Sequence, residues 1–394
     1  MAETSDLLVV GAGHAGVHLA TRLVQGEFEG SIRLLSDQAL YPYEKPPLSK
    51  SWLKAEVTLE EIQFRSAAYW ERSPVDLRLG VRVTDVDPDA RIVMTESGDE
   101  YGYTRLVWAA GGRPRRLPSM GDHPNVHYLG NLADAQALQA STADRVVVIG
   151  GGFIGLEVAA TLRQRGAHVV VVESLPRLMA RATGRLVARH VESVHRAQGV
   201  EFRFEDGVVG ADVDGDARVT GVQLASGESL PADLVLIGIG QVPNEDILVR
   251  AGAHASNGLL VDAEFRTNLD GVYAIGDVAR FPLDDRDDPL RLEAVQNAVA
   301  HSKALADLLL TQKRSPLGAP TFWSNQFDVA FKSAGLVTDY DTEIVRGDVE
   351  SGAFSVLYLR DGVLVAIECV NRDSDFGWGR RTIGTVADID AREW

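Results

Sequence analysis

Residues 6–24 read DLLVVGAGHAGVHLATRLV, and residues 31–37 continue as SIRLLSD. A short apolar run that enters a glycine-rich turn and then an apolar helix predicts the start of a dinucleotide-binding unit. The first glycine allows the tight turn, the second lets a diphosphate approach the backbone, and the third lets the helix pack on the strand. These glycines are Gly11, Gly13 and Gly16. Asp37, 21 residues beyond the last of them, is expected to accept hydrogen bonds from ribose hydroxyls.

A second copy of this pattern occupies residues 145–166, RVVVIGGGFIGLEVAATLRQRG, and residues 168–174, HVVVVES. Its glycines are Gly150, Gly152 and Gly155, and its strand-terminal acid is Glu173. A carboxylate there favours NAD, because the extra phosphate of NADP would face a like charge. The nearby Arg177 and Arg181 are either cations that offset this preference or exposed helix or loop charges without such a role. Two dinucleotide sites on one chain predict hydride transfer from one dinucleotide to the other.

Strand-like segments with turn residues follow each copy, at residues 75–111 and 200–240, and are expected to form a β-meander in each half. From about Pro320 a further run of strands (VAFKSAGL, EIVRGDV, FSVLYLRDG, VLVAIECV) predicts a small third domain. The acidic residues 284–289 predict a loop. The expected fold class is α/β, with two Rossmann-like dinucleotide-binding domains of the glutathione-reductase type and a small α+β C-terminal domain.

The charge and cysteine content limit the partners and the location. The net charge is −17, from 39 lysines and arginines against 56 acidic residues, and this field repels nucleic acid and anionic lipid surfaces. The single cysteine, Cys369, excludes an intrachain disulfide and predicts a reducing, cytoplasmic location. The N-terminal residues lack the basic region of a secretory signal, and the apolar residues 146–156 are too few to span a membrane. We expect no nucleic-acid partner, no membrane and no metal.

Six further motifs occur in order along nearly the whole chain. They are YEKPPLSK (residues 43–50), AAGGRPRRLP (109–118), GIGQVPN (238–244), YAIGDVARF (273–281), RLEAVQNA (291–298) and FWSNQFD (322–328). Together they resemble the oxygenase-coupled, FAD-dependent ferredoxin reductases, the class of the putidaredoxin, rubredoxin and biphenyl dioxygenase ferredoxin reductases. The first and last of these motifs are the more specific marks, since many two-dinucleotide flavoproteins share the others.

The resemblance assigns FAD to the first glycine site and NADH to the second. It implies that Asp277 binds the ribityl chain of FAD. It also implies that Lys50 and Glu157 are a catalytic pair, with Lys50 beside the flavin. A carboxylate partner is expected because an unpaired buried ammonium is costly. The residues implied for FAD are Gly11, Gly13, Gly16, Asp37, Lys45, Lys50, Ala110, Arg113, Asp277, Val295 and Trp323, and those implied for NAD are Gly150, Gly152, Gly155, Glu157, Glu173 and Gly240.

Several of these positions carry further expectations. Val295 opens a predicted helix whose amino end would face the flavin and stabilise negative charge on it. Lys45 stands where the family usually has arginine, so its contact with FAD loses a bidentate fork. Ala110 replaces a common threonine. The expected domains are an FAD-binding domain of residues 1–115 and 245–319, an NAD-binding domain of residues 116–244, and a C-terminal domain of residues 320–394.

The implied activity is NADH-dependent reduction of FAD, followed by single-electron transfer to a [2Fe-2S] ferredoxin that serves a cytochrome monooxygenase or a Rieske dioxygenase. A disulfide reductase needs a cysteine pair after the first glycine unit, and residues 37–50 contain none.

An acidic ferredoxin needs basic docking residues, for which Arg291 is the first candidate. The others are Arg113, Arg115 and Arg116. Two alternatives stay open: an NADH-binding signalling flavoprotein resembling apoptosis-inducing factor, and a quinone or dye reductase.

Overall fold

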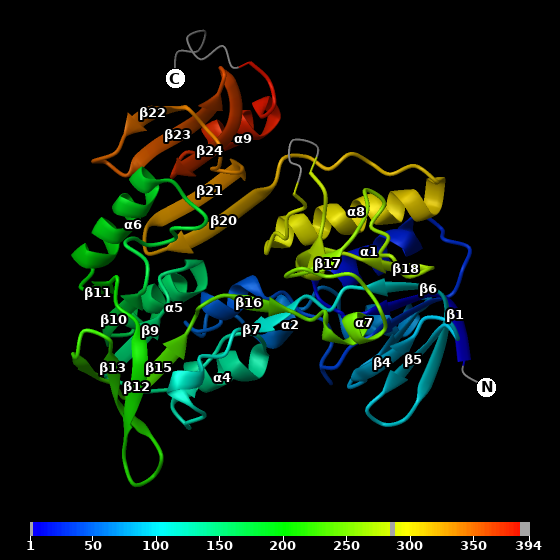
Figure 1. Ribbon diagram of the computed structural model, residues 1–394, viewed down its shortest axis with the longest axis horizontal. Helices are drawn as coiled ribbons and strands as arrows, with labels where there is room; N and C mark the ends of the chain where they lie inside the picture. Colours follow the sequence, from blue (N-terminus) through cyan, green and yellow to red (C-terminus); the bar gives the residue numbers. More distant parts are fainter. Residues whose placement is uncertain (1–2, 284–287, 387–394) are drawn as a thin grey trace. The chain divides into compact units, whose positions relative to one another are not determined.

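The computed structural model describes residues 3–283 and 288–386, so residues 284–287 of the predicted acidic loop lie outside the described part (Figure 1). The described residues divide into two compact units. Unit 1 takes its residues from Met1–Lys45, Thr58–Arg113 and Gln241–Gly318, and unit 2 from Pro46–Val57, Pro114–Gly240 and Ala319–Trp394. Within the described ranges, no helix is both long and apolar enough to cross a membrane.

Unit 1 is built on a mixed sheet with the strand order β3-β2-β1-β6-β5-β4. Strands β1 to β3 and β6 run parallel, and the C-terminal part of β6 also pairs in parallel with β18. The N-terminal part of β6 pairs antiparallel with β5, which pairs with β4. The strands are β1 (Glu3–Val10), β2 (Ile32–Leu35), β3 (Val75–Arg78), β4 (Val83–Asp87), β5 (Ile92–Thr95), β6 (Glu100–Trp108) and β18 (Val272–Ala274). The expected first meander is therefore only partly correct, because β3 belongs to the parallel sheet.

The apolar run of β1 is buried on both faces, as expected of a central parallel strand; Leu7, Leu8 and Val9 are fully buried. Two helices, α1 (His14–Gln25) and α8 (Val295–Thr311), pack against each other in this unit, and the Ser302 hydroxyl donates to the Ala15 carbonyl at 2.7 Å. The predicted start of α8 at Val295 is confirmed.

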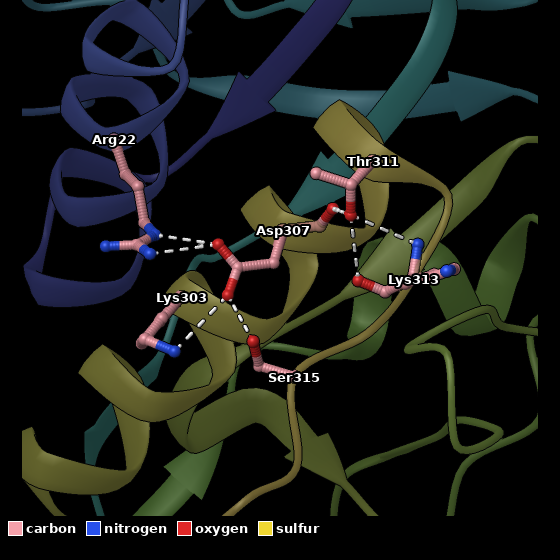
Figure 2. A network of polar contacts seen from close by, with 6 residues as sticks. All are labelled: Arg22, Lys303, Asp307, Thr311, Lys313 and Ser315. Carbon is pink, nitrogen blue, oxygen red and sulfur yellow. Dashed lines mark hydrogen bonds and ion pairs between the residues drawn. The ribbon is translucent and has the colours of Figure 1, made fainter.

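A polar network fixes α8 to α1 and to the segment that follows α8 (Figure 2). The Asp307 carboxylate accepts from Arg22 Nη2 at 2.9 Å, pairs with Lys303 Nζ at 3.3 Å, and accepts from the Ser315 hydroxyl. Thr311 Oγ1 donates to the Lys313 carbonyl at 3.2 Å. One carboxylate thus holds three separate parts of unit 1 together.

The shorter elements of unit 1 connect its sheet and its two long helices. They are α2 (Leu59–Ile62), α3 (Ala67–Arg72), α7 (Asp246–Arg250), β17 (Leu259–Leu260), η3 (Gly276–Val278) and β19 (Ala279–Arg280). The strands β7 (Gly112–Pro114) and β16 (Gln241–Pro243) lie where the chain passes from one unit to the other.

Unit 2 contains a parallel sheet with the order β11-β10-β9-β15-β8 and a small antiparallel sheet with the order β12-β13-β14. Its elements up to residue 240 are η1 (Pro46–Ser49), η2 (Pro118–Met120), β8 (Val126–His127), α4 (Leu132–Ala140), β9 (Arg145–Ile149), α5 (Phe153–Gln164), β10 (His168–Glu173), α6 (Arg185–Ala197), β11 (Glu201–Phe204), β12 (Val208–Val213), β13 (Val219–Leu224), β14 (Ser229–Pro231) and β15 (Leu234–Ile237). The second expected meander is also shorter than predicted, since β11 is an edge strand of the parallel sheet.

The C-terminal part of unit 2 is an antiparallel sheet with the order β20-β21-β24-β23-β22, covered by helix α9. The elements are β20 (Thr321–Gln326), β21 (Val329–Gly335), β22 (Thr342–Asp348), β23 (Ala353–Arg360), β24 (Val363–Val370) and α9 (Asp373–Thr382). The strand run expected after Pro320 is confirmed. The sequence predicts an α+β domain but does not place its helix α9, because Gly377 and Gly379 lower the local helix propensity. A Cβ at Gly379 would overlap Ile367, so that glycine allows close packing on β24.

Helix α6 is bonded to this sheet near both of its ends. The fully buried Glu368 carboxylate accepts from the backbone N–H of Gly184, the residue before α6, at 3.0 Å, and from the Tyr358 hydroxyl at 2.6 Å. In the last turn of α6, His195 bonds Gln326 of β20 at 2.9 Å. Burial raises the pKa of Glu368 to about 7, so this carboxyl group keeps its proton to a higher pH than an exposed carboxyl group does.

Candidate active site

The first glycine loop in unit 1 has the geometry that the sequence predicts. Gly11 has a φ of +109°, which favours glycine, and a Cβ at Gly16 would overlap the carbonyl oxygen of Gly11. A Cβ at Gly13 would meet no atom within 4 Å, and helix α1 begins there without a side-chain cap. The backbone at Gly13 is therefore open to close approach, and the first N–H groups of α1 have no side-chain cap, so the loop fits a diphosphate.

The second loop, in unit 2, repeats this geometry. Gly150 has a φ of +108°, a Cβ at Gly155 would overlap the Gly150 carbonyl oxygen, and Gly152 faces open space. Helix α5 also begins without a side-chain cap. Gly240, at the end of the segment after β15, has a φ of +100° and open space on its Cβ side. These features fit a second dinucleotide.

The two predicted ribose acids differ in their surroundings. Glu173, at the end of β10, accepts from the Gly151 N–H at 2.8 Å through Oε2 and from the Leu175 N–H at 2.9 Å through Oε1. Asp37 lies two residues beyond the end of β2 and pairs with Arg82 at 3.2 Å on the surface. Each acid follows its predicted strand, and the ribose contact of each stays a prediction.

Three residues predicted for FAD lie together in unit 1. Asp277, in η3, lies near the backbone N–H of Ala294, the residue before Val295 and α8, and this N–H acts to lower the pKa of its carboxyl group. Burial, followed by repulsion from Glu293, raises the pKa of Asp277 to about 6, and the positive charge of Lys45 opposes this rise. Helix α8 has no side-chain cap at its start. A carboxylate held beside an open helix terminus fits the hydroxyls of a sugar chain.

Ala110 and Arg113 lie in unit 1 with Asn244. The Asn244 amide donates to the Ala110 carbonyl at 2.8 Å, and Arg113 donates to the Asn244 side chain at 3.0 Å. Arg113 also pairs with Asp246 at 2.7 Å. In this structure Arg113 therefore fixes the backbone near the start of α7, and its role in binding FAD stays a prediction.

The expectation that Arg291 is an exposed docking residue is wrong. Its side chain is only 8% exposed, pairs with Glu293 at 2.7 Å and donates to the Asp277 carbonyl at 3.1 Å. A guanidinium committed to these internal bonds presents no surface charge to a partner. Of the other candidates, Arg116 is 68% exposed and pairs with Asp122 at 2.9 Å.

The predicted catalytic pair lies entirely within unit 2. Lys50 follows η1, and its Nζ atom is 2.6 Å from Oε2 of Glu157 on α5. The Lys50 side chain is 18% exposed and that of Glu157 is 5% exposed. The ammonium of Lys50 also lies 4.8 Å from the ring centroid of Trp323 on β20. Lys50, Glu157 and Trp323 therefore meet although they come from three separate parts of the sequence.

Sequence reasoning missed two serines that bind the same carboxylate. The Ser49 hydroxyl donates to Glu157 Oε2 at 2.5 Å, and the Ser324 hydroxyl donates to Glu157 Oε1 at 2.5 Å. Both lie inside motifs of the family resemblance, PPLSK and FWSNQ, which predict site roles only for Lys50 and Trp323. The signal available was the position of each serine next to a predicted site residue.

The one cysteine lies outside the two glycine loops, in the C-terminal sheet. Cys369, on β24, is 1% exposed, and burial raises its pKa to about 12, so it is an inert thiol. Among the residues that the structure describes, no group of three or more histidine, cysteine, aspartate or glutamate side chains could hold a metal ion. Two dinucleotide loops and a lysine–carboxylate pair define an oxidoreductase that combines two dinucleotides.

The chain belongs to the pyridine nucleotide-disulphide oxidoreductase family, whose model matches residues 5–302, and residues 321–394 match the reductase C-terminal domain. The expected resemblance, the fold class and the oxidoreductase activity are thereby confirmed. The use of FAD with a nicotinamide dinucleotide, the cofactor pair of this family, is confirmed with them.

The relatives cover almost the whole chain. A ferredoxin–NAD(P)(+) reductase of Sphingomonas sp. is 42% identical over 390 residues, which are 98% of this chain and 94% of the relative. Putidaredoxin reductase of Pseudomonas putida is 36% identical over 97% of this chain and 92% of its own length. The solved ferredoxin reductase for the CYP199A2 system of Rhodopseudomonas palustris gives a TM-score of 0.94 at 35% identity, covering 99% of this chain and 98% of that one.

Proposed function

We propose that this protein takes electrons from NADH through FAD and delivers them singly to a small [2Fe-2S] ferredoxin. The observation that carries the proposal is the presence of two uncapped glycine loops in a chain whose one cysteine is buried and inert. Without a thiol relay, electrons that enter at one dinucleotide must leave from the other. The named activities of the Sphingomonas and Pseudomonas relatives support a ferredoxin as the acceptor.

Bound FAD would supply the chemistry, since it accepts an electron pair as hydride and releases electrons one at a time. The chain supplies binding and electrostatics. The helix termini at Gly13 and Gly152 would hold the two diphosphates, and Asp277 would hold the sugar alcohol of FAD. Glu157 fixes the ammonium of Lys50 in one place and compensates its charge. FAD binding by residues 1–115 and 245–319, NAD binding by residues 116–244, and a cytoplasmic location are parts of the proposal.

Glu173 makes NADH the preferred donor. Its carboxylate is fixed by two backbone N–H groups, so it cannot swing away from a 2′-phosphate without losing both bonds. A like-charge juxtaposition that costs several kcal/mol corresponds to a preference of at least roughly 100-fold in kcat/KM. Replacing Glu173 with alanine should reduce this preference to below about tenfold, whereas Glu201→Ala, on the surface at the start of β11, should leave it unchanged. Equal kcat/KM values for NADH and NADPH in the wild type would contradict the assignment.

The decisive experiment follows the flavin spectrum without oxygen. NADH should bleach the purified yellow protein, and the bleached protein should then reduce an added [2Fe-2S] ferredoxin, read by the ferredoxin's own absorbance. Ferricyanide serves as the control acceptor that needs no docking. A long-lived NADH-reduced flavin that reduces ferricyanide but no tested ferredoxin would favour a signalling flavoprotein. Rapid reduction of a soluble quinone with none of ferredoxin would favour a quinone reductase.

A further inference from the structure

A chain of buried hydrogen bonds runs through unit 2 and ends on Glu157. His195 Nε2 lies 2.9 Å from Gln326 Oε1, Gln326 Nε2 lies 3.1 Å from Ser324 Oγ, and Ser324 Oγ lies 2.5 Å from Glu157 Oε1. All four side chains are buried, with exposed fractions between 0% and 5%. These hydrogen bonds therefore connect α6, β20 and α5 without passing through solvent.

The direction of these bonds follows from His195. Burial lowers the pKa of His195 to about 4, so at neutral pH the ring carries one proton. Its Nδ1 atom is buried and has no hydrogen-bond partner among the described residues, whereas Nε2 faces the carbonyl oxygen of Gln326. The proton is therefore on Nε2. From there every group donates toward the carboxylate: His195 to Gln326, Gln326 to Ser324, and Ser324 to Glu157.

The carboxylate at the end of the chain is held at both oxygens. Ser324 donates to Oε1, while Ser49 and Lys50 donate to Oε2. The ammonium alone would not fix the rotation of the carboxylate, because either oxygen could face it. The hydroxyl of Ser324, polarised by the bond it accepts from Gln326, fixes Oε1 and leaves Oε2 for Lys50.

We propose that Ser324, backed by Gln326 and His195, is a positioning residue that sets the orientation of Glu157 and thereby the location of the Lys50 ammonium. This inference rests on the proposed function, in which Lys50 takes part in NADH-dependent reduction. Strand β20 thus contributes to the reaction through its buried serine as well as through Trp323.

The polar chain is not needed to hold β20 on α5. Phe153 of α5 packs against Phe322 of β20 at 4.3 Å between ring centroids and against Phe331 of β21 at 5.6 Å. These apolar contacts stabilise the packing of the strand on the helix. A row of buried polar groups costs desolvation that an apolar contact does not. What this row of polar groups adds to the apolar packing is a fixed orientation of the Glu157 carboxylate.

The test compares Ser324→Ala with the conservative Ser324→Thr and with Ser355→Ala, all in the FAD-loaded protein. Ser355 is a matched control because it is fully buried in the same sheet and donates to the Asp375 carboxylate at 2.8 Å, away from Glu157. The rate of flavin reduction at saturating NADH should fall about tenfold in Ser324→Ala, with the dissociation constant for NADH unchanged, because orientation and not binding is lost. Ser324→Thr should recover to within about threefold, and Ser355→Ala should match the wild type.

A second readout is independent of turnover. The chain has only six lysines, so reductive ¹³C-methylation gives few NMR signals, and a Lys50→Arg variant assigns that of Lys50. Ser324→Ala and Gln326→Met should both move the Lys50 signal, and Ser355→Ala should not. An unmoved signal and an unchanged rate in Ser324→Ala would overturn the inference. A wild-type flavin that NADH does not bleach would instead contradict the proposed function, while the NMR comparison could still be made.

Discussion

Replacing Glu368 with glutamine should make the protein more stable at pH 8 but not at pH 5. Glu368 lies fully buried on β24 and accepts from the Gly184 N–H and the Tyr358 hydroxyl. Glutamine has nearly the same shape, accepts from Gly184 through its oxygen and can donate to the tyrosine oxygen. The substitution therefore keeps the packing between α6 and the C-terminal sheet and removes only the ability to ionise.

The magnitude follows from the raised pKa. In the unfolded chain this carboxyl group has its ordinary pKa of 4.5, and burial raises the pKa of Glu368 to about 7 in the folded protein. Between these values the folded state holds a proton that the unfolded state has released, so stability falls as the pH rises through this window. The largest loss is about 3 kcal/mol, complete above pH 7 and absent below pH 4.5. The glutamine variant avoids this loss.

The assay is hydrogen exchange of the α6 and β24 peptides in increasing urea at pH 5, 6, 7 and 8, because unfolding of several units is not a single transition. The exchange midpoint of Glu368→Gln should match the wild type at pH 5 and exceed it progressively toward pH 8. Glu350→Gln, at an exposed residue before β23, is the charge-matched control. Its exchange midpoint should differ from that of the wild type by the same amount at every pH. If the difference in exchange midpoint between Glu368→Gln and the wild type stayed the same from pH 5 to pH 8, the raised pKa would be refuted as the cause.

Three further predictions concern the glycine loops, the network of Figure 2 and the cysteine. Gly155→Ala should destabilise unit 2 by roughly 2 kcal/mol or more, because its Cβ would overlap backbone. Gly152→Ala should leave the melting temperature unchanged and weaken NAD⁺ binding, with both quantities measured by calorimetry. Equal melting temperatures of the two variants would contradict this prediction. Asp307→Asn should cost about 1 kcal/mol by weakening the bond to Arg22, seen as a lower melting temperature at pH 7 and no difference in strong acid. Cys369 should react with Ellman's reagent only after denaturation; rapid reaction of the native protein would disprove its burial.

The parts of the site that depend on local sequence could be predicted, and the parts that depend on distant contacts could not. The turn at Gly11 and the helix that begins after Gly13 follow from neighbouring residues, so the pattern was enough. The pairing of Lys50 with Glu157 joins positions 107 residues apart, and only the resemblance to a family indicated it. For Ser324 the only signal was its position next to the predicted Trp323, and that position does not show which carboxylate its hydroxyl binds.

The error at Arg291 has the same origin. The sequence places an arginine next to the start of a helix, and arginine is usually exposed. Its burial depends on Glu293, two residues away, together with Asn257 and the Asp277 carbonyl, which only the folded chain brings within reach. Helix α9 of the predicted α+β domain could not be placed for a related reason: Gly379, which weakens the helix locally, is the glycine that lets it approach β24.

The two glycine units share one geometry but hold their acids differently, and the difference matches the proposed division of labour. Glu173 is fixed by the N–H groups of its own loop, whereas Asp37 only pairs with an exposed arginine on the surface. A donor that enters and leaves in every cycle must be distinguished from NADP each time, and a pre-oriented carboxylate does this without reorganisation. A cofactor that stays bound is selected once, so its ribose acid needs no such constraint. This reasoning supports the proposal that the exchanging nucleotide, NADH, binds unit 2 beside the rigid acid.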